Sequence, residues 1–358
     1  MTPRPDILRR LRHACVLLAP ILLGGCETLG YLTQAAGGHL SIIGGARSVE
    51  RWLADPNASA ELKRRLASAR AIRQFASRQL HLPDNDSYRS YVELGRPFAV
   101  WNVVAAPEFS LQPLRSCFPV SGCVDYRGFF SLEDARRYAR SLRERGNDVL
   151  VRGVPAYSTI GYFDDPLLSS FIDYPDTELA RLLFHELAHQ VVYVRDDSSF
   201  NESFAVALER EGVKRWLSAQ GREQDLASFG TASKRAESLN ALLAGTRARL
   251  LYLYRDNRAP NSTEALRAAK AREFARLKAD YEALKASWGG FAGYDRIFGE
   301  SPNNALLAAT HSYARLVPAF QALLQDSGAN LERFYARVRE LAALPAEQRE
   351  ETLKRPLN

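Results

Sequence analysis

The spacing of hydrophobic positions predicts mixed secondary structure in the first half of the chain. Residues 47–80 carry apolar side chains at helical intervals, whereas residues 92–106 are rich in β-branched and aromatic side chains and are expected to form a strand. A helix is predicted over 129–145, and short strands are predicted at 148–152 and 156–161. The first half is therefore expected to hold a sheet with helices packed beside it.

The second half of the chain has helical periodicity almost throughout. One helix is predicted over about 176–194 and another over about 201–220, with Gly221 past its end. Loops rich in proline and glycine separate further helices, which are expected at about 223–256, 262–287, 303–326 and 330–341. Strands followed by helices predict an α+β fold, with a small mixed or antiparallel sheet and a largely α-helical C-terminal half.

Composition and charge set limits on the class of protein. The chain has 358 residues, of which 46% are hydrophobic and 10% aromatic, so it can bury a sizeable core. The formal net charge is +7; residues 1–25 hold four arginines against one aspartate, a net +3, which leaves +4 for the rest. No basic stripe with interleaved aromatics is present, so a nucleic-acid partner is not expected. We expect one domain at 47–345, with an α+β part at 47–221, a helical part at 222–345 and a C-terminal tail at 346–358.

The N-terminal segment has the organisation of a bacterial lipoprotein signal peptide. Residues 4–12 are basic, and the apolar run at 14–23 is too short to span a bilayer as a helix. The sequence Leu23-Gly24-Gly25-Cys26 is similar to a lipobox, in which small residues precede the cysteine that becomes lipidated. This pattern predicts a signal peptide at 1–25, a lipidated Cys26 and a tether at 26–46. A plain secretory signal with a chance cysteine is the alternative.

The residue after Cys26 bears on the location of the mature protein. Glu27 is not the aspartate that commonly marks retention in the inner membrane. We therefore expect a periplasmic protein that is anchored to the outer membrane through its N-terminal lipid only.

Two cysteines remain in the body of the chain, Cys117 and Cys123, separated by five residues. In an oxidising periplasm a pair this close is most simply a disulfide that closes a small loop. A metal-binding pair is the alternative, although no second cysteine or histidine pair has finger-like spacing.

The most informative chemistry lies in the segment His185-Glu186-Leu187-Ala188-His189. Residues four apart project from one face of a helix, so both imidazoles can bind one Zn²⁺ ion. Glu186 follows the first histidine and is placed to act as general base and then acid on a metal-bound water. The helix is otherwise strongly apolar, and buried polar groups are costly without partners, which favours a metal site over a chance match.

The chain resembles a bacterial family of predicted periplasmic zinc aminopeptidases over most of residues 27–341. Residues 200–205 resemble the Asn-Glu-x-x-Ala element of the gluzincin peptidases, and this resemblance makes Glu202 the third metal ligand. Glu209, two helical turns further on, is the alternative. Ser116 stands where an aromatic residue is expected. The other matching segments are 101–107, 117–123, 126–128, 156–161, Asn303-Asn304 and Tyr313.

The resemblance implies a zincin-like fold, one Zn²⁺ ion per chain and peptide substrates. An edge strand that precedes the metal helix would then bind the substrate main chain, although an ordinary core strand is an equal interpretation. Tyr313 is the expected donor to the oxyanion, with Tyr157 and Tyr193 as alternatives and a core aromatic as the plain interpretation. The candidate substrate-binding residues are Ala156, Tyr157, Ser158, Thr159 and Gly161.

The specificity for a free N-terminus is the least defined part of this interpretation. Asp164 and Asp165 follow the predicted edge strand and could bind an amine, but a turn before Pro166 explains them more simply. Arg127 could bind a carboxylate or pair with an acid. The sequence therefore predicts an aminopeptidase, with an endopeptidase or envelope-remodelling hydrolase, or a non-catalytic metal-binding lipoprotein, as alternatives.

Overall fold

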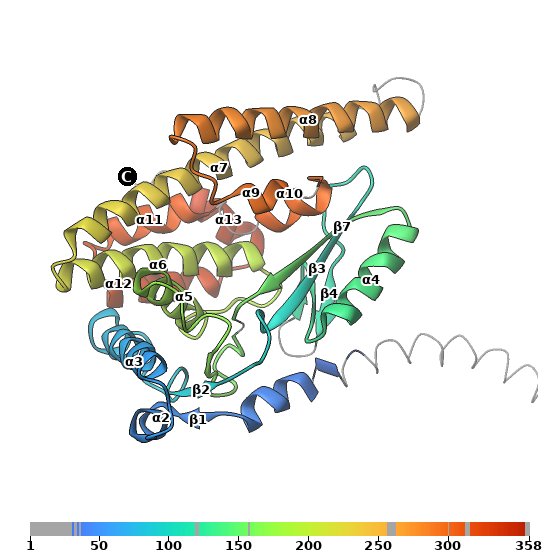
Figure 1. The fold of residues 1–358 in the computed structure, drawn as a ribbon. Coiled ribbons are helices and arrows are strands. Elements are labelled where there is room, and N and C mark those ends of the chain that lie inside the picture. Colours follow the sequence, from blue (N-terminus) through green and yellow to red (C-terminus); the bar gives the residue numbers. More distant parts are fainter. Residues whose placement is uncertain are drawn as a thin grey trace, which may run out of the picture. The chain divides into compact units, whose positions relative to one another are not determined.

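The computed structural model describes residues 31, 34–35, 37–118, 122–156, 158–255, 263–299, 301–311 and 316–354 (Figure 1). Two units are distinguished, 1–45 and 46–358, and every element named below belongs to the second. In the first unit, residues 37–44 are helical. Within the described ranges no helix is both long enough and apolar enough to cross a membrane. The predicted signal peptide, Cys26, Tyr157 and Tyr313 lie outside the described residues.

The domain begins with a small sheet and two helices. Strands β1 (Arg47–Ser48), β2 (Ser90–Val92) and β8 (Leu167–Leu168) pair in the order β1-β2-β8, with β1 antiparallel and β8 parallel to β2. Helices α2 (Val49–Ala54) and α3 (Ala60–Leu80) lie between the first two strands in sequence. The helical periodicity of residues 47–80 is therefore confirmed for most of its length, as two helices.

A second sheet has the order β6-β3-β7 and is antiparallel throughout. Its strands are β3 (Val100–Pro107), β6 (Arg127–Phe129) and β7 (Asn147–Val154). Helices α4 (Leu132–Glu144) and α10 (Asn304–His311) both pack against it, and Figure 1 shows them on either side of β3 and β7. A sheet with helices beside it confirms the α+β class.

The strand predicted over 92–106 is confirmed for residues 100–106, which belong to β3, but its first part is wrong, because residues 93–99 separate β3 from β2 and these two strands belong to different sheets. Gly95 has φ +62°, and Pro97 follows shortly afterwards, so the chain turns between the two strands. The Arg96 guanidinium donates to the carbonyls of Phe98 and Ala99 at 3.1 and 3.0 Å, which holds this turn.

The prediction of a strand over 156–161 is also wrong for the residues described there. Ile160 and Gly161 have φ of +59° and +81°, which a strand does not accommodate. The Thr159 N–H donates to the carboxylate of Asp165 at 2.9 Å, and its hydroxyl contacts the main chain of Phe163 at 3.1 Å. Side chains in this segment satisfy backbone groups that a strand would pair with a neighbour, so it forms a turn.

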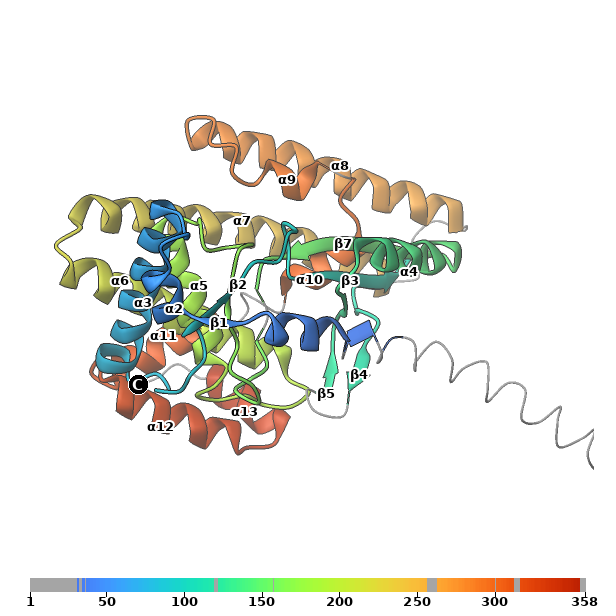
Figure 2. The ribbon, with the colours of Figure 1, turned by 60° about the horizontal axis from the view of Figure 1, so that its bottom comes forward.

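The cysteine hairpin consists of β4 (Ser116–Phe118) and β5 (Gly122–Val124), which lie side by side in Figure 2. Cys117 and Cys123 are directly opposite one another in its register and form a disulfide. The predicted disulfide is therefore confirmed.

Helices α5 (Asp176–Ala188) and α6 (Ser198–Ala219) pack closely against each other. We expected the first to continue to about residue 194, but it ends at Ala188 with His189 as its C-cap. The second begins at Asp197, whose carboxylate accepts from the Phe200 N–H at 3.0 Å. Nine residues therefore connect the two helices.

The C-terminal half is helical, as predicted. Helices α7 (Glu223–Arg255) and α8 (Thr263–Ser287) lie side by side (Figure 1). The helix expected over 303–326 is divided into α10 and α11 (Val317–Asp326), and residues 312–315 between them are outside the described part. The remaining elements are α9 (Asp295–Phe298), α12 (Leu331–Ala342) and α13 (Ala346–Lys354).

The core beneath α5 and α6 is aromatic. Phe204 of α6 packs against Phe320 of α11 and Phe334 of α12, with ring centroids 5.8 Å apart in both cases. Phe200 lies 5.1 Å from Phe320, and all four rings are fully buried. These contacts fix one face of α6 and leave another face for α5.

Residues 346–354 differ from the tail that we expected. They form α13, which packs against α11 and α12. Its Arg349 is 5% exposed and donates to Asp197 at 2.8 and 3.0 Å. This helix therefore contacts the connection between α5 and α6.

Candidate metal centre

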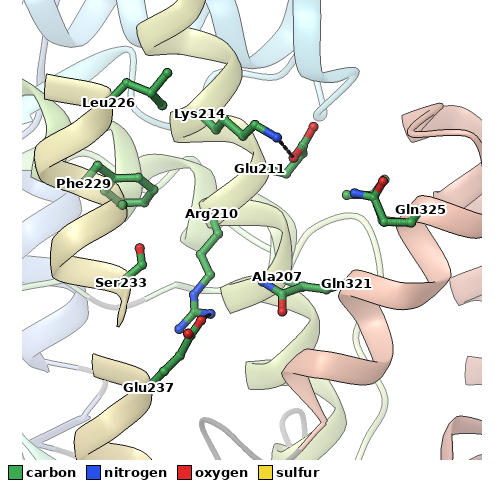
Figure 3. Close-up of a pocket in the computed structure, with 12 residues that line it drawn as sticks. Ala207, Arg210, Glu211, Lys214, Leu226, Phe229, Ser233, Glu237, Gln321 and Gln325 are labelled. Carbon is green, nitrogen blue, oxygen red and sulfur yellow. Dashed lines mark hydrogen bonds and ion pairs between the residues drawn. The ribbon is translucent and has the colours of Figure 1, made fainter. Parts of the chain in front are cut away.

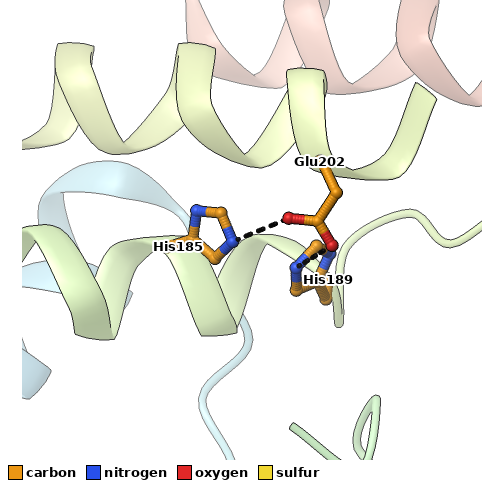
Figure 4. A group of neighbouring side chains, drawn as sticks. All are labelled: His185, His189 and Glu202. Carbon is orange, nitrogen blue, oxygen red and sulfur yellow. Dashed lines mark ion pairs between the residues drawn. The ribbon is translucent and has the colours of Figure 1, made fainter. Parts of the chain in front are cut away.

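The structure brings together the three side chains that the sequence proposes as metal ligands (Figure 4). His185 Nε2 lies 3.3 Å from one carboxylate oxygen of Glu202, and His189 Nε2 lies 3.8 Å from the other. The ligand atoms of all three residues fall within 4.8 Å of one another, so this group could hold a metal ion. Two residues come from α5 and its C-cap, and the third from the first turns of α6.

Local geometry explains the arrangement of the histidines. They are four residues apart, so their rings lie on one face of α5 with centroids 4.9 Å apart and planes at 86°. Glu202 is the fifth residue of α6, so it faces them as soon as the chain has returned. The short connection between the helices therefore suffices for a three-residue site.

Glu209, the alternative third ligand, occupies a different position. One of its carboxylate oxygens lies 2.8 Å from His185 Nδ1, on the opposite side of the ring from Glu202. The Arg181 guanidinium donates to the same carboxylate at 3.3 and 3.4 Å. A partner on the distal nitrogen fixes the tautomer and orientation of a metal-binding histidine. The arrangement therefore gives Glu209 the place of an outer partner.

The sequence did not predict this role for Glu209. Glu209 lies two helical turns after Glu202 and was expected only as an alternative to it as the third ligand. Arg181 precedes His185 by four residues, so both side chains lie on one face of α5, and two such neighbours favour a carboxylate between them; this was the available signal.

The charges of the two glutamates act on His185. Burial opposes its protonation, but hydrogen bonds and charges from Glu202 and Glu209 outweigh burial and raise its pKa well above the usual value. Burial also opposes the ionisation of Glu209, yet the charge of Arg181 and the contact with His185 hold its pKa below the usual value. Both glutamates are therefore carboxylates at neutral pH.

His189 is in a different environment from His185. Burial lowers its pKa to about 4, so its imidazole is neutral, which is the form that binds metals. Its Nδ1 is buried and has no hydrogen-bond partner among the described residues.

Glu186 lies beside His185 in sequence and is half-buried. Burial raises its pKa to about 7; the positive charge of His185 opposes this shift, and the charges of Glu202 and Asp165 add to it. A carboxylate that exchanges its proton near neutral pH suits a general base.

The remaining candidates divide between the site and other places. The Tyr193 ring lies 6.4 Å from that of His189, so this tyrosine borders the site. Asp165 is 3% exposed and accepts from the Thr159 N–H, so it stabilises the turn at 158–165, as the simpler interpretation proposed. The guanidinium of Arg127 lies 4.8 Å from the centre of the Tyr138 ring on α4.

A separate cavity of about 310 Å³ lies between α6, α7 and α11 (Figure 3). Arg210 pairs there with Glu237 at 2.7 Å, and Lys214 lies 4.0 Å from Glu211. Two positive and two negative groups therefore line this cavity. None of the metal-site residues lines it.

The fold and the site together define an α+β protein with a group of two histidines and one glutamate that could hold a metal ion. Residues 30–353 match the model of the family described as "Putative aminopeptidase", and the chain belongs to this family. The expected aminopeptidase family is thereby confirmed, and at a coarse level the match supports a peptidase. No curated protein matches the chain, and no solved structure matches it.

Proposed function

We propose that this protein is a zinc-dependent aminopeptidase with a zincin-like site. The observation that carries the proposal is that the ligand atoms of His185, His189 and Glu202 lie within 4.8 Å of one another. Glu186 follows His185 on α5 and lies beside this group. The aminopeptidase family supports the choice of peptides as substrates.

The residues present fit a zinc ion. Two imidazoles and one carboxylate are a usual donor set of catalytic zinc, which leaves a position for water or substrate. The distal nitrogen of His185 is held by Glu209, so its Nε2 is directed to the centre. Burial keeps His189 neutral, and the negative charge of Glu202 complements a divalent cation.

The chemistry divides between the ion and the chain. When bound, Zn²⁺ supplies Lewis acidity, which makes a water molecule acidic enough to act as a nucleophile near neutral pH. The Glu186 carboxylate accepts a proton from the attacking water and passes it to the nitrogen of the leaving amine. A tyrosine hydroxyl, proposed to be that of Tyr313, donates a hydrogen bond to the substrate oxygen as negative charge develops there.

The proposed activity is tested with the chain from residue 27 onward, supplied with Zn²⁺. Wild type and Glu186→Gln are assayed on fluorogenic amino-acid amides and on N-blocked peptides. We expect cleavage of the amides, and a loss of at least about 100-fold in kcat with Glu186→Gln while zinc still binds. Equal activity of the two proteins would exclude Glu186 as the base. Cleavage of N-blocked peptides alone would identify an endopeptidase with the same metal site.

We also propose that the protein is a periplasmic lipoprotein anchored to the outer membrane through Cys26. The sequence from Leu23 to Cys26 supports this location, as does the disulfide in the domain, since disulfides persist in oxidising compartments. Cys26→Ser is expected to release the protein from the membrane fraction, and membrane association that survives this change would argue against lipidation.

A further inference from the structure

The connection between the two metal-binding helices contacts a hairpin that lies far away in sequence. The Cys123 N–H of β5 donates to the Asp196 carboxylate at 2.6 Å, across 73 residues. The Arg115 guanidinium donates to the carbonyls of Cys123 and Asp196 at 2.9 and 3.3 Å. The hairpin and the connection are therefore joined by main-chain and side-chain hydrogen bonds.

The two segments are also in close steric contact at Gly122. A Cβ atom at this position would lie 2.6 Å from Cγ of Arg195 and 2.7 Å from the Asp196 carboxylate. The backbone of β5 thus approaches the connection as closely as a residue without a side chain allows.

The connection leads from Asp196 directly into α6, the helix that carries Glu202. Asp196 has φ +68°, a conformation that costs free energy in a residue with a side chain, so its contacts must hold it there. Five residues separate it from Glu202. Within them the Asn201 side chain bonds both the N–H and the carbonyl of Val194 at 2.7 Å, which closes the connection onto the residue before Glu202.

The hairpin is too small to be rigid by itself, and the disulfide makes it rigid. In the described part of the chain, β4 and β5 form a two-stranded sheet of their own, with three residues in each strand. An isolated hairpin this small is marginally stable in water. The bond between the opposed residues Cys117 and Cys123 keeps β5 in register, and thereby holds the Cys123 N–H against Asp196.

We infer that the disulfide-linked hairpin is a positioning device for the metal centre: through Asp196 it holds the connection so that Glu202 stays at ligand distance from His185 and His189. The inference rests on the proposed zinc site. Asp196 and the cysteines are not members of the group that could hold the ion, and they act through the placement of the third ligand.

The test compares zinc affinity with stability in variants of the chain from residue 27 onward. Cys117→Ser/Cys123→Ser removes the covalent bond, and Asp196→Gly removes the carboxylate while it keeps the backbone conformation favourable. Zinc dissociation constants are measured by competition with a chromophoric chelator, and melting temperatures are measured without metal. We expect each variant to bind zinc about tenfold more weakly, as loss of outer support for a ligand does.

Two further variants separate positioning from general stability. Asp196→Asn keeps an oxygen that accepts from the Cys123 N–H and tolerates positive φ, so it is expected to retain wild-type zinc affinity. Glu237→Gln removes another carboxylate contact to α6, at Arg210, and is the matched control with unchanged affinity.

The outcomes distinguish the two proposals. Wild-type affinity in both the cysteine-free and the Asp196→Gly proteins, with only the metal-free melting temperature lowered, would overturn the positioning role and leave the zinc site standing. A wild-type protein that binds no zinc through His185 and His189 would overturn the proposed function and this inference with it. If the cysteine-free protein does not fold, Asp196→Gly against Asp196→Asn decides the matter.

Discussion

The imidazole of His185 lies between two carboxylates, and its Nδ1 is 2.8 Å from Glu209. Its Nε2 is 3.3 Å from Glu202, so the two nitrogens of one ring have partners from the same helix, α6, at positions seven residues apart. Two residues of α6 therefore orient the His185 side chain of α5. The first prediction follows from the different places of these two glutamates.

Substitution of the two glutamates by glutamine is expected to affect zinc binding unequally. Glu202→Gln removes a ligand charge and should abolish tight binding, with a loss of about 100-fold or more, because catalytic zinc uses three protein ligands. Glu209→Gln keeps an oxygen near His185 and should weaken binding about tenfold. Chelator competition measures both constants. A larger loss with Glu209→Gln than with Glu202→Gln would assign the ligand to Glu209.

Zinc affinity is also expected to depend on pH. The pKa of His185 is raised by Glu202 and Glu209, against the effect of burial, so at low pH the metal must displace a proton from this ring. Affinity should therefore rise with pH, by up to about tenfold per unit below the pKa of His185, and level off above it. Titrations at several pH values measure the slope. Constant affinity across the range would mean that His185 does not carry the competing proton.

The variant Glu209→Gln is expected to change the pH dependence of zinc affinity. Loss of the Glu209 charge removes one of the causes that raise the pKa of His185, so the rise in affinity with pH should end at a lower pH than in wild type. An unchanged curve would show that Glu202 alone governs the protonation of this ring.

The parts of the site that the sequence predicted are those set by local geometry. His185 and His189 share a helical face because they are four residues apart, whatever the tertiary fold. The position of Glu202 followed from a family element. The role of Glu209 depends on how α6 packs against α5, and no local pattern states which carboxylate meets which nitrogen of the ring.

The two errors in the strand predictions have a common physical cause. Residues 156–161 and the first part of 92–106 have the composition of strands, but side chains compete there for backbone groups. The Asp165 carboxylate accepts a hydrogen bond from the Thr159 N–H. The Arg96 guanidinium donates to two carbonyls that follow Gly95. Composition predicts what a segment favours on average, but it does not show which nearby polar side chain will bind the backbone groups of that segment.

Asp165 provides a prediction on stability. Burial raises its pKa to about 6, against 3.8 for an ordinary aspartate, while hydrogen bonds from Thr159 and Ser158 oppose the shift. The native state therefore binds more protons than the unfolded state between these values, so this group makes stability fall as the pH rises through the window. Asp165→Asn keeps an acceptor for the Thr159 N–H without the buried charge. It should raise the free energy of unfolding at pH 8 by up to about 3 kcal/mol.

Urea unfolding of the metal-free protein at pH 5 and pH 8 checks this expectation. The gain from Asp165→Asn should be smaller at pH 5, where the native carboxyl is largely protonated. Asp164→Asn, at the exposed neighbouring position, is the matched control and should change little at either pH. A gain equal at both pH values would argue against a buried charge as the cause.

Substitution of Arg349 tests whether α13 contributes to the stability of the domain. Its guanidinium is buried and joins Asp197, the cap of α6, to the carbonyl of Leu344 at 2.8 Å. Arg349→Ala leaves the aspartate and the carbonyl without this partner, so it should lower the free energy of unfolding by about 3 kcal/mol. Arg333→Ala, at an exposed position of α12, should lower it by less than about 0.5 kcal/mol. Urea unfolding measures both free energies. If Arg349→Ala lowers the free energy of unfolding no more than Arg333→Ala does, residues 346–354 do not stabilise the domain.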